Sequence, residues 1–353
     1  MKQRKAYLDH LRILAALSVV ITHVLSEFWY RADIRSLEWN VMNIFETALR
    51  WNVAIFIMVS GSLFLSKDVP TKTIYRKYIP RMAVSYVVWS LLYATLDPYF
   101  KTGTLDLSLT TVIKRTIEGG YHMWFVPMII GLYMCLPIFR EIVKSEKVTK
   151  YFLGLSFLFT FLIPQMALIS NDIIGGSIAE GFKNIKNFVS YKMSMSTVLG
   201  FSFYFILGYY INTVEITKKQ RRIIYSLGIL GFLATVLLTA IVSMKNGSGS
   251  AQYYDHFNIG ILSEAVALHT LIRYRKHSNE KRNAIARYLG KYSFGVYLVH
   301  VFLMNILLFK LRMPALFGSP LISIPIISLT VILLSFGVIW LIHRIPILKK
   351  WIV

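Results

Sequence analysis

Arg12 and His23 lie in the first long apolar stretch of the chain, which reads LRILAALSVVITHVLSEF from Leu11 to Phe28. In a helix, their separation of eleven residues places both side chains on one face, about 16 Å apart along the axis. Ionisable side chains inside a membrane are costly and usually functional. A neutral imidazole can take a proton from an alcohol, so His23 is a candidate general base.

Each of these residues also has a simpler interpretation. His23 could be a buried structural histidine, and Arg12, near the start of the stretch, could extend its guanidinium to the membrane surface. Asp9 lies three residues before Arg12, the spacing at which a carboxylate pairs with a cation on one helix face. The pattern therefore predicts a catalytic set of His23, Arg12 and Asp9.

Polar residues in later apolar stretches are further candidates. Arg50 lies at the outer end of the second stretch, and Ser60 precedes Gly61 nearer its inner end. A Ser-Gly pair is equally typical of close helix packing in membranes. His122 and Trp124 begin the fourth stretch, at an interface where aromatic residues are common without any catalytic role.

The eighth and ninth stretches carry three more candidates. Glu264 lies in the eighth, where a lone carboxylate in hydrocarbon needs a partner or a proton. Tyr297 and His300 in the ninth are three residues apart and so share one helix face. A proton-coupled transporter would also carry such groups, so they do not separate transport from catalysis.

A basic stretch, KTIYRKYIPR, runs from Lys72 to Arg81 before the third apolar stretch. One interpretation is an anchor that holds this end of the helix in the cytoplasm. The other is a docking surface on which Arg76, Lys77 and Arg81 bind the phosphates of a cytosolic substrate.

The composition predicts an all-α, polytopic membrane protein. Of the 353 residues, 56% are hydrophobic and 16% charged, whereas soluble domains have about 45–50% apolar and about 25% charged residues. The net charge of +22 falls in short loops between apolar runs, which indicates membrane topology rather than nucleic-acid binding. The single Cys135 excludes a disulfide framework and a cysteine-cluster metal site. We predict no metal.

The apolar pattern predicts a bundle of ten transmembrane helices, at residues 8–29, 43–65, 80–97, 122–139, 151–169, 197–212, 223–243, 257–272, 288–309 and 320–342. With these segments, the gaps on the N-terminal side hold 26 lysines and arginines and the opposite gaps hold 11. The positive-inside rule then places both termini in the cytoplasm.

Several catalytic signatures are absent from the sequence. It contains no GxSxG nucleophile elbow, no P-loop and no HExxH motif. A covalent serine mechanism and a metal mechanism therefore lose support.

The chain resembles the acyltransferase 3 family of integral-membrane O-acyltransferases. The resemblance rests on an Arg and a His separated by ten residues, on the Ser-Gly pair, and on the motifs LDHLRILAALSVVITH (8–23), RWNVAIFIMVSGSLFL (50–65), YRKYIPRMAVSY (75–86), YHMWF (121–125), FYFILGYYI (203–211) and LGKYSFGVYLVH (289–300). Within the family it is similar to stand-alone members, so we expect one membrane domain over residues 1–353. Many members carry Arg-x-x-Arg before the third helix, where this chain has Tyr78 and Arg81.

The resemblance implies a ten-helix protein of the bacterial inner membrane that uses acetyl-CoA or another acyl-CoA as donor. The acceptor would be a hydroxyl of a glycan or of a lipid-linked sugar. His23 would be the general base, helped by Arg12 and Asp9. Contacts to the donor are expected from Arg76, Lys77, Arg81 and Ser60. Contacts to the acceptor are expected from Arg50, His122, Trp124, Glu264, Tyr297 and His300.

Two other functions remain open from the sequence. The first is a transporter or flippase for a small polar solute, with His23, Glu264 and His300 as proton-relay groups. Some relatives in the family are membrane modules linked to amino-acid racemases, for which transport has been proposed. The second is the unrelated superfamily of membrane-bound O-acyltransferases, whose usual Asn-plus-His arrangement is not evident here.

Overall fold

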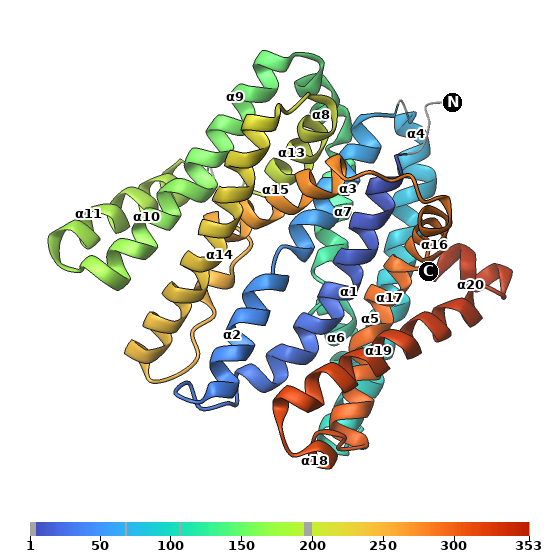
Figure 1. Cartoon of the computed structure of the whole chain (residues 1–353). Helices are drawn as coiled ribbons and strands as arrows, with labels where there is room; N and C mark the ends of the chain where they lie inside the picture. The colour runs from blue at the N-terminus through green and yellow to red at the C-terminus, as the bar shows by residue number, and fades with distance from the viewer. Residues whose placement is uncertain (1–4, 68, 106, 194–199, 353) are drawn as a thin grey trace. The chain divides into compact units, whose positions relative to one another are not determined.

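The computed structural model describes residues 5–67, 69–105, 107–193 and 200–352, and every regular element in these ranges is a helix (Figure 1). This confirms the all-α class. Seven of the described helices are long and apolar enough to cross a bilayer: Ala6–Trp29, Leu37–Leu65, Thr71–Phe100, Glu146–Ile174, Lys218–Asn246, Ser293–Lys310 and Pro320–Ile342. The pair Phe125–Met134 and Leu136–Lys144 makes an eighth if counted as one broken span.

The predicted count of ten spans is not confirmed. Two of the predicted segments correspond to α13 (Ser202–Thr213) and α15 (Ile259–Tyr274), which have 12 and 16 residues. A spanning helix needs about 20 residues, so neither is long enough alone. The predicted segment 197–212 also begins at residues outside the described ranges.

The chain divides into two compact units, each built from several separate parts of the sequence. The first comprises Met1–Arg31, Val69–Cys135 and His277–Val353. Its helices are α1 (Ala6–Trp29), α4 (Thr71–Thr73), η1 (Ile74–Tyr78), α5 (Ile79–Thr102), α6 (Leu109–Glu118), α7 (Phe125–Met134), α16 (Glu280–Gly290), α17 (Ser293–Asn305), η6 (Ile306–Lys310), α18 (Pro314–Phe317), α19 (Pro320–Ile342) and α20 (Pro346–Trp351).

The second unit comprises Ala32–Asp68 and Leu136–Lys276. Besides α13 and α15, its helices are α2 (Leu37–Leu49), α3 (Asn52–Leu65), α8 (Leu136–Lys144), α9 (Glu146–Ser156), η2 (Phe157–Leu162), α10 (Ile163–Ile169), η3 (Ser170–Ile174), α11 (Gly176–Asn187), η4 (Phe188–Lys192), α14 (Lys218–Asn246) and η5 (Gln252–Tyr254).

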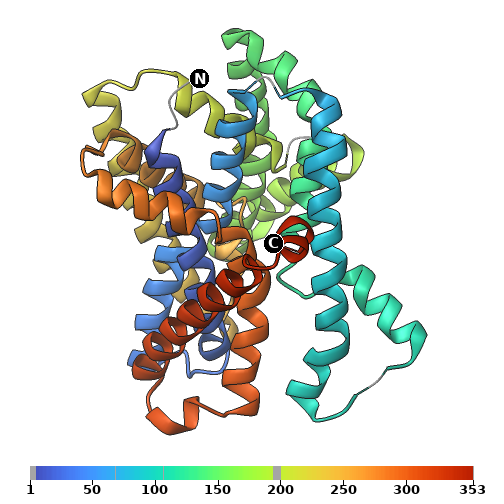
Figure 2. The same ribbon diagram turned by 90° about the vertical axis from the view of Figure 1, so that its right-hand side faces the viewer.

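In the first unit, α1 packs against α16, α17 and α19, and α5 packs against α6, α7 and α17. Figure 2 shows α6 returning alongside the far end of α5. Tyr93 joins α5 to α17, because its hydroxyl donates to Leu298 O at 2.9 Å and accepts from Phe302 N at 2.9 Å. These contacts hold α1, α5 and α17 as a frame for polar side chains.

In the second unit, α3 and α13 approach each other closely through glycines. A Cβ added to Gly61 would lie 1.8 Å from Phe205 O, and one added to Gly208 would lie 2.1 Å from Met58 O. Ser62 Oγ donates across the same interface to Gly208 O at 2.8 Å. The glycine of the Ser-Gly pair therefore serves close helix packing.

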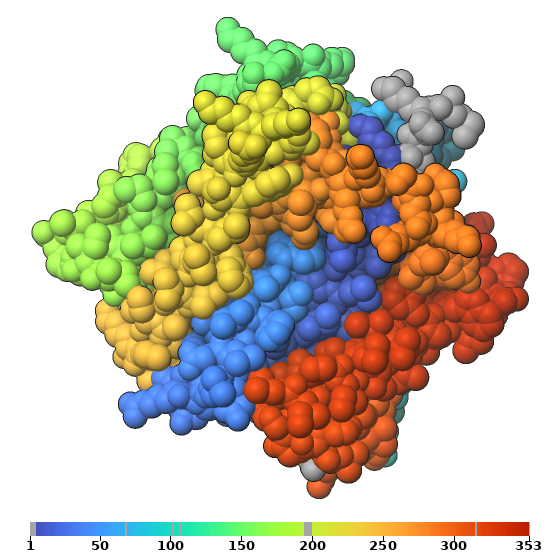
Figure 3. Space-filling view, viewed as in Figure 1, coloured from blue at the N-terminus to red at the C-terminus, as the bar shows by residue number. Residues whose placement is uncertain are grey.

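Helix α14 is seen in Figure 3 as a long yellow ridge. Its exposed side chains include Leu227, Leu230, Leu233, Leu237 and Ile241. A long helix that is apolar on its exposed side is expected to face lipid. The chain is thus a multi-pass membrane protein.

The charge asymmetry predicts that residues 244–256 lie on the extracytoplasmic side of the membrane, and cysteine labelling can test this. In a Cys135→Ser background, Ser248→Cys should react with a membrane-impermeant maleimide in intact cells. Lys219→Cys, near the other end of α14, should react only after permeabilisation. The reverse pattern would contradict the predicted orientation.

Candidate active site

Three histidines from distant parts of the sequence meet in the first unit. His23 comes from α1, His122 from the connection between α6 and α7, and His300 from α17. The ring centroids are 5.2 Å apart for His23 and His300, 5.2 Å for His122 and His300, and 6.1 Å for His23 and His122. The rings of His122 and His300 are buried, whereas His23 is partly exposed. This histidine cluster brings three predicted site residues together.

Hydrogen bonds from α17 fix two sides of the histidine cluster. The Tyr297 hydroxyl donates to His122 O at 2.6 Å, and His300 Nδ1 lies 2.7 Å from Tyr297 O. A carbonyl oxygen can only accept, so His300 Nδ1 carries a proton and donates it. Its Nε2 is buried and has no hydrogen-bond partner among the described residues. His300 therefore adds a buried ring nitrogen without a protein partner to the histidine cluster.

The connection that carries His122 is shaped by two glycines. Gly119 has φ +73°, and a Cβ on it would lie 2.6 Å from the Tyr86 hydroxyl, which donates to Ile117 O at 2.9 Å. A side chain at Gly119 would therefore be both strained and obstructed. Met123 N donates to Gly120 O at 2.7 Å, which closes the turn that carries His122.

Tyr121, in the same connection, contacts His23. Its hydroxyl lies 3.3 Å from His23 Nδ1, and the two ring centroids are 5.4 Å apart in an edge-on arrangement. The residue is 54% exposed. A phenol can donate to an unprotonated ring nitrogen, so Tyr121 lies where a hydroxyl-bearing ligand could reach the histidine cluster.

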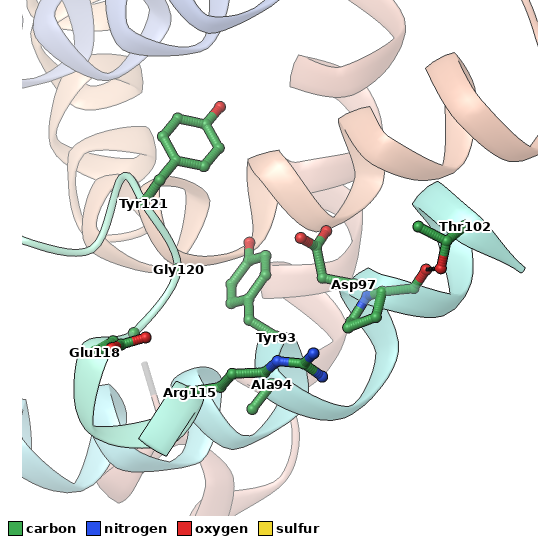
Figure 4. Close-up of a pocket in the computed structure, with 10 residues that line it drawn as sticks. Tyr93, Ala94, Asp97, Thr102, Arg115, Glu118, Gly120 and Tyr121 are labelled. Atoms are coloured by element: carbon green, nitrogen blue, oxygen red, sulfur yellow. Dashed lines mark hydrogen bonds between the residues drawn. The ribbon is translucent and has the colours of Figure 1, made fainter. Parts of the chain in front are cut away.

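A cavity of about 320 Å³ lies next to the histidine cluster. Figure 4 shows its wall, to which α5 and α6 contribute charged side chains and the connection after α6 contributes Tyr121. Its lining includes Tyr93, Asp97, Arg115, Glu118, Gly120 and Tyr121. Ligand sites typically have volumes of about 300–1,000 Å³, so this cavity is large enough for one small ligand or for one ring of a larger ligand.

The wall of this cavity is held rigidly. The Tyr93 and His122 rings are 5.0 Å apart between centroids, and Asn305 Nδ2 donates to Asp97 Oδ1. Tyr93 and Asp97 are one helical turn apart on α5, and both bind α17. The cavity and the histidine cluster thus share α5 and α17 as their support.

The predicted catalytic residues Asp9 and Arg12 lie on α1, toward the opposite end from His23. Asp9 is buried, and a Cβ on Gly290 would lie 3.7 Å from its Oδ1. Arg12 is half-buried on the next turn. The helical rise keeps Arg12 about 16 Å from His23, so a direct contact between the two is excluded.

The predicted donor-binding residues Arg76, Lys77 and Arg81 are all exposed at the start of the α5 span. Arg76 and Lys77 belong to a π-helical stretch, Ile74–Tyr78, and such stretches often occur at functional sites. The Arg81 guanidinium donates to Lys349 O at 3.3 Å. Their side chains form an accessible basic cluster.

Three other predicted residues belong to the second unit, and their contacts within that unit are as follows. Arg50 pairs with Glu46 and lies 4.9 Å from the centroid of the Tyr254 ring. Ser60 is half-buried in α3. Glu264 is largely buried in α15, and its Oε1 has no hydrogen-bond partner among the described residues.

Sequence reasoning missed five side chains around the cavity: Tyr93, Asp97, Arg115, Glu118 and Tyr121. The only available signals were the spacing of Tyr93 and Asp97 on one helix face and the position of Tyr121 beside His122.

Trp124, which was predicted, is partly exposed, precedes the first residue of α7 and contacts Phe125. In the described ranges, no group of three or more His, Cys, Asp or Glu side chains is arranged to hold a metal.

Comparisons with known proteins agree with the sequence resemblance. A family model described as an acyltransferase domain matches residues 5–344. An amino-acid racemase of Enterococcus faecalis is 27% identical over 251 residues, which are 68% of this chain and 33% of the racemase. The chain therefore spans about a third of the length of that relative. No solved structure matches significantly.

Proposed function

We propose, because this chain belongs to the acyltransferase family whose model it matches, that it transfers an acyl group from cytoplasmic acyl-CoA to a hydroxyl. We take acetyl as the acyl group and a cell-envelope glycan or lipid-linked sugar as the acceptor. The observation that carries the proposal is the meeting of His23, His122 and His300 beside a ligand-sized cavity.

His23 acts as the general base in this reaction. Its ring nitrogen takes the proton of the acceptor hydroxyl while the oxygen attacks the thioester carbonyl, and the C–S bond then breaks. CoA leaves as a thiolate and receives the proton from the imidazolium. The hydrogen bond from His300 Nδ1 to Tyr297 O supports this role, because it holds the His300 ring in place 5.2 Å from the His23 ring.

The proposed donor-binding residues and the acceptor cavity lie along one helical span. The basic cluster Arg76, Lys77 and Arg81 lies at the start of the α5 span, and Tyr93 and Asp97 line the cavity further along it. Arg81 and Tyr93 are twelve residues apart, or about 18 Å along the axis. In this proposal the CoA phosphates bind the basic cluster, and the pantetheine arm extends along α5 toward His23.

Neutralising the basic cluster tests the donor end. The triple variant Arg76→Gln/Lys77→Gln/Arg81→Gln should raise the KM for acetyl-CoA by about three- to hundredfold, because three exposed ion pairs contribute ~0.2–1 kcal/mol each. It should also flatten the salt dependence of this KM. The matched control is Lys218→Gln/Lys219→Gln/Arg222→Gln at the start of α14, which removes the same charge. An equal KM for acetyl-CoA in both folded variants would mean that the basic cluster only orients the helix in the membrane and does not bind the donor.

Transport is the competing function, and Glu264 is the observation that favours it. Its carboxyl oxygen is buried in α15 without a hydrogen-bond partner in the described ranges, as a proton carrier requires. Acyl transfer consumes a thioester and leaves acylated sugars, which transport does not. Comparing the masses of envelope glycans from wild-type and deletion cells tests this difference, and we expect acyl groups to be lost on deletion.

A further inference from the structure

Tyr121 stands between the cavity and the candidate general base. We infer that its hydroxyl occupies the hydrogen-bonding place on His23 Nδ1 that the acceptor hydroxyl takes during the reaction. Tyr121 is then a positioning residue that the acceptor must displace. The inference rests on the proposed function and adds to it the route by which the acceptor reaches His23.

Tyr121 connects the cavity to His23. Tyr121 is part of the cavity lining, and its hydroxyl lies 3.3 Å from His23 Nδ1. Figure 4 shows the Tyr121 hydroxyl directed away from Arg115 and Asp97 at the other end of the cavity. A ligand that takes the place of the phenol would therefore extend from the cavity to Nδ1.

Tyr121 can move while its neighbours cannot. It is 54% exposed, whereas the next residue, His122, is held through its carbonyl by Tyr297 at 2.6 Å. The turn is closed by the hydrogen bond from Met123 N to Gly120 O at 2.7 Å. Rotation of the Tyr121 side chain would thus open His23 while His122 keeps its hydrogen bond from Tyr297.

The charges of the cavity indicate the class of acceptor. Asp97 and Glu118 supply two carboxylates against the single guanidinium of Arg115, and Tyr93 supplies an aromatic ring. Carboxylates accept hydrogen bonds from hydroxyl groups and repel anions. We therefore assign the cavity to an uncharged ring that carries several hydroxyl groups.

The hydrogen bond between the Tyr121 hydroxyl and His23 Nδ1 also protects the thioester of the donor from hydrolysis. Water that reached an unoccupied Nδ1 could lose a proton to His23 and attack the thioester, which would break the C–S bond and release acetate and CoA. Occupation of Nδ1 by Tyr121 prevents this loss until an acceptor arrives. Removing only the hydroxyl should therefore increase hydrolysis.

The test compares Tyr121→Phe with Tyr30→Phe, a matched exposed tyrosine at the end of the same helix α1 that carries His23. The purified full chain in nanodiscs is given acetyl-CoA without acceptor, and CoA thiol release is followed. In parallel, diethyl pyrocarbonate is added, and carbethoxylation of the His23 peptide is timed by mass spectrometry. We expect Tyr121→Phe to raise both rates by about two- to tenfold, the loss of one hydrogen bond, and Tyr30→Phe to change neither.

The two readouts separate the two claims. If His23 in Tyr121→Phe reacts with diethyl pyrocarbonate no faster than in Tyr30→Phe, the inference about Tyr121 is overturned. If that reaction is faster but no variant releases CoA even when the envelope glycan fraction is added, Tyr121 does hold His23 and the proposed function fails instead. Faster reaction together with faster CoA release supports both.

Discussion

Replacing His23 with glutamine should lower acyl transfer by about 10²–10⁴-fold, because a positioned general base contributes that much to a rate. Glutamine keeps the size and hydrogen-bonding capacity of the side chain but cannot take the proton. Transfer of radiolabelled acetyl from acetyl-CoA to the envelope glycan fraction measures the loss. Binding of acetyl-CoA should change little, since the basic cluster Arg76, Lys77 and Arg81 is untouched.

The matched control is His10→Gln on the same helix. His10 Nε2 lies 3.1 Å from Asn283 Oδ1 and its ring packs against His277, outside the histidine cluster. We expect its activity to stay within about twofold of wild type, as for a substitution that leaves transition-state contacts intact. A monodisperse His23→Gln protein that binds acetyl-CoA and acylates at the wild-type rate would remove the base from this site.

The largest loss of stability is expected from Gly61→Ala. The added Cβ would lie 1.8 Å from Phe205 O and 2.6 Å from Phe205 C, and backbone atoms cannot move aside as a flexible side chain can. Overpacking costs about 1–3 kcal/mol, occasionally more, and here it must force α3 and α13 apart. Thermal unfolding in detergent should show a clearly lower melting temperature or no folded protein.

Gly154→Ala in α9 of the same unit is the control for this substitution. A Cβ at Gly154 meets no atom within 4 Å, and alanine favours a helix over glycine by about 1 kcal/mol. Its melting temperature should therefore stay equal or rise. If Gly61→Ala melted like Gly154→Ala, the close approach of α3 and α13 would be wrong.

The sequence predicted what depends on local pattern. The apolar run around His23 predicted a spanning helix, and the spacing of Tyr297 and His300 predicted one shared face, because both follow from helical periodicity. The hydrogen bond from His300 Nδ1 to Tyr297 O agrees with that face. Helix number was harder, since apolar composition alone does not tell a full span from the short helices α13 and α15.

Long-range contacts could not be predicted in the same way. His23 meets a residue 98 positions away in Tyr121, and no periodicity relates the two segments. Tyr93 and Tyr121 carry no functional signal in the sequence, because aromatic residues near membrane surfaces are common without any function. The sequence predicted Ser60 as a site residue. The structure instead gives a reason for its neighbour Gly61, because a Cβ there would collide with the backbone of Phe205.

The most direct test of acyl transfer is to follow the thioester itself. Purified protein in nanodiscs is mixed with acetyl-CoA and the envelope glycan fraction, and CoA thiol release is measured together with the mass of the glycans. We expect release that depends on the glycan fraction, a matching gain of acetyl groups on the glycans, and loss of both in His23→Gln. Folded wild-type protein that leaves acetyl-CoA unconsumed, while proteoliposomes containing it show solute or proton flux that Glu264→Gln abolishes, would contradict the account and establish transport.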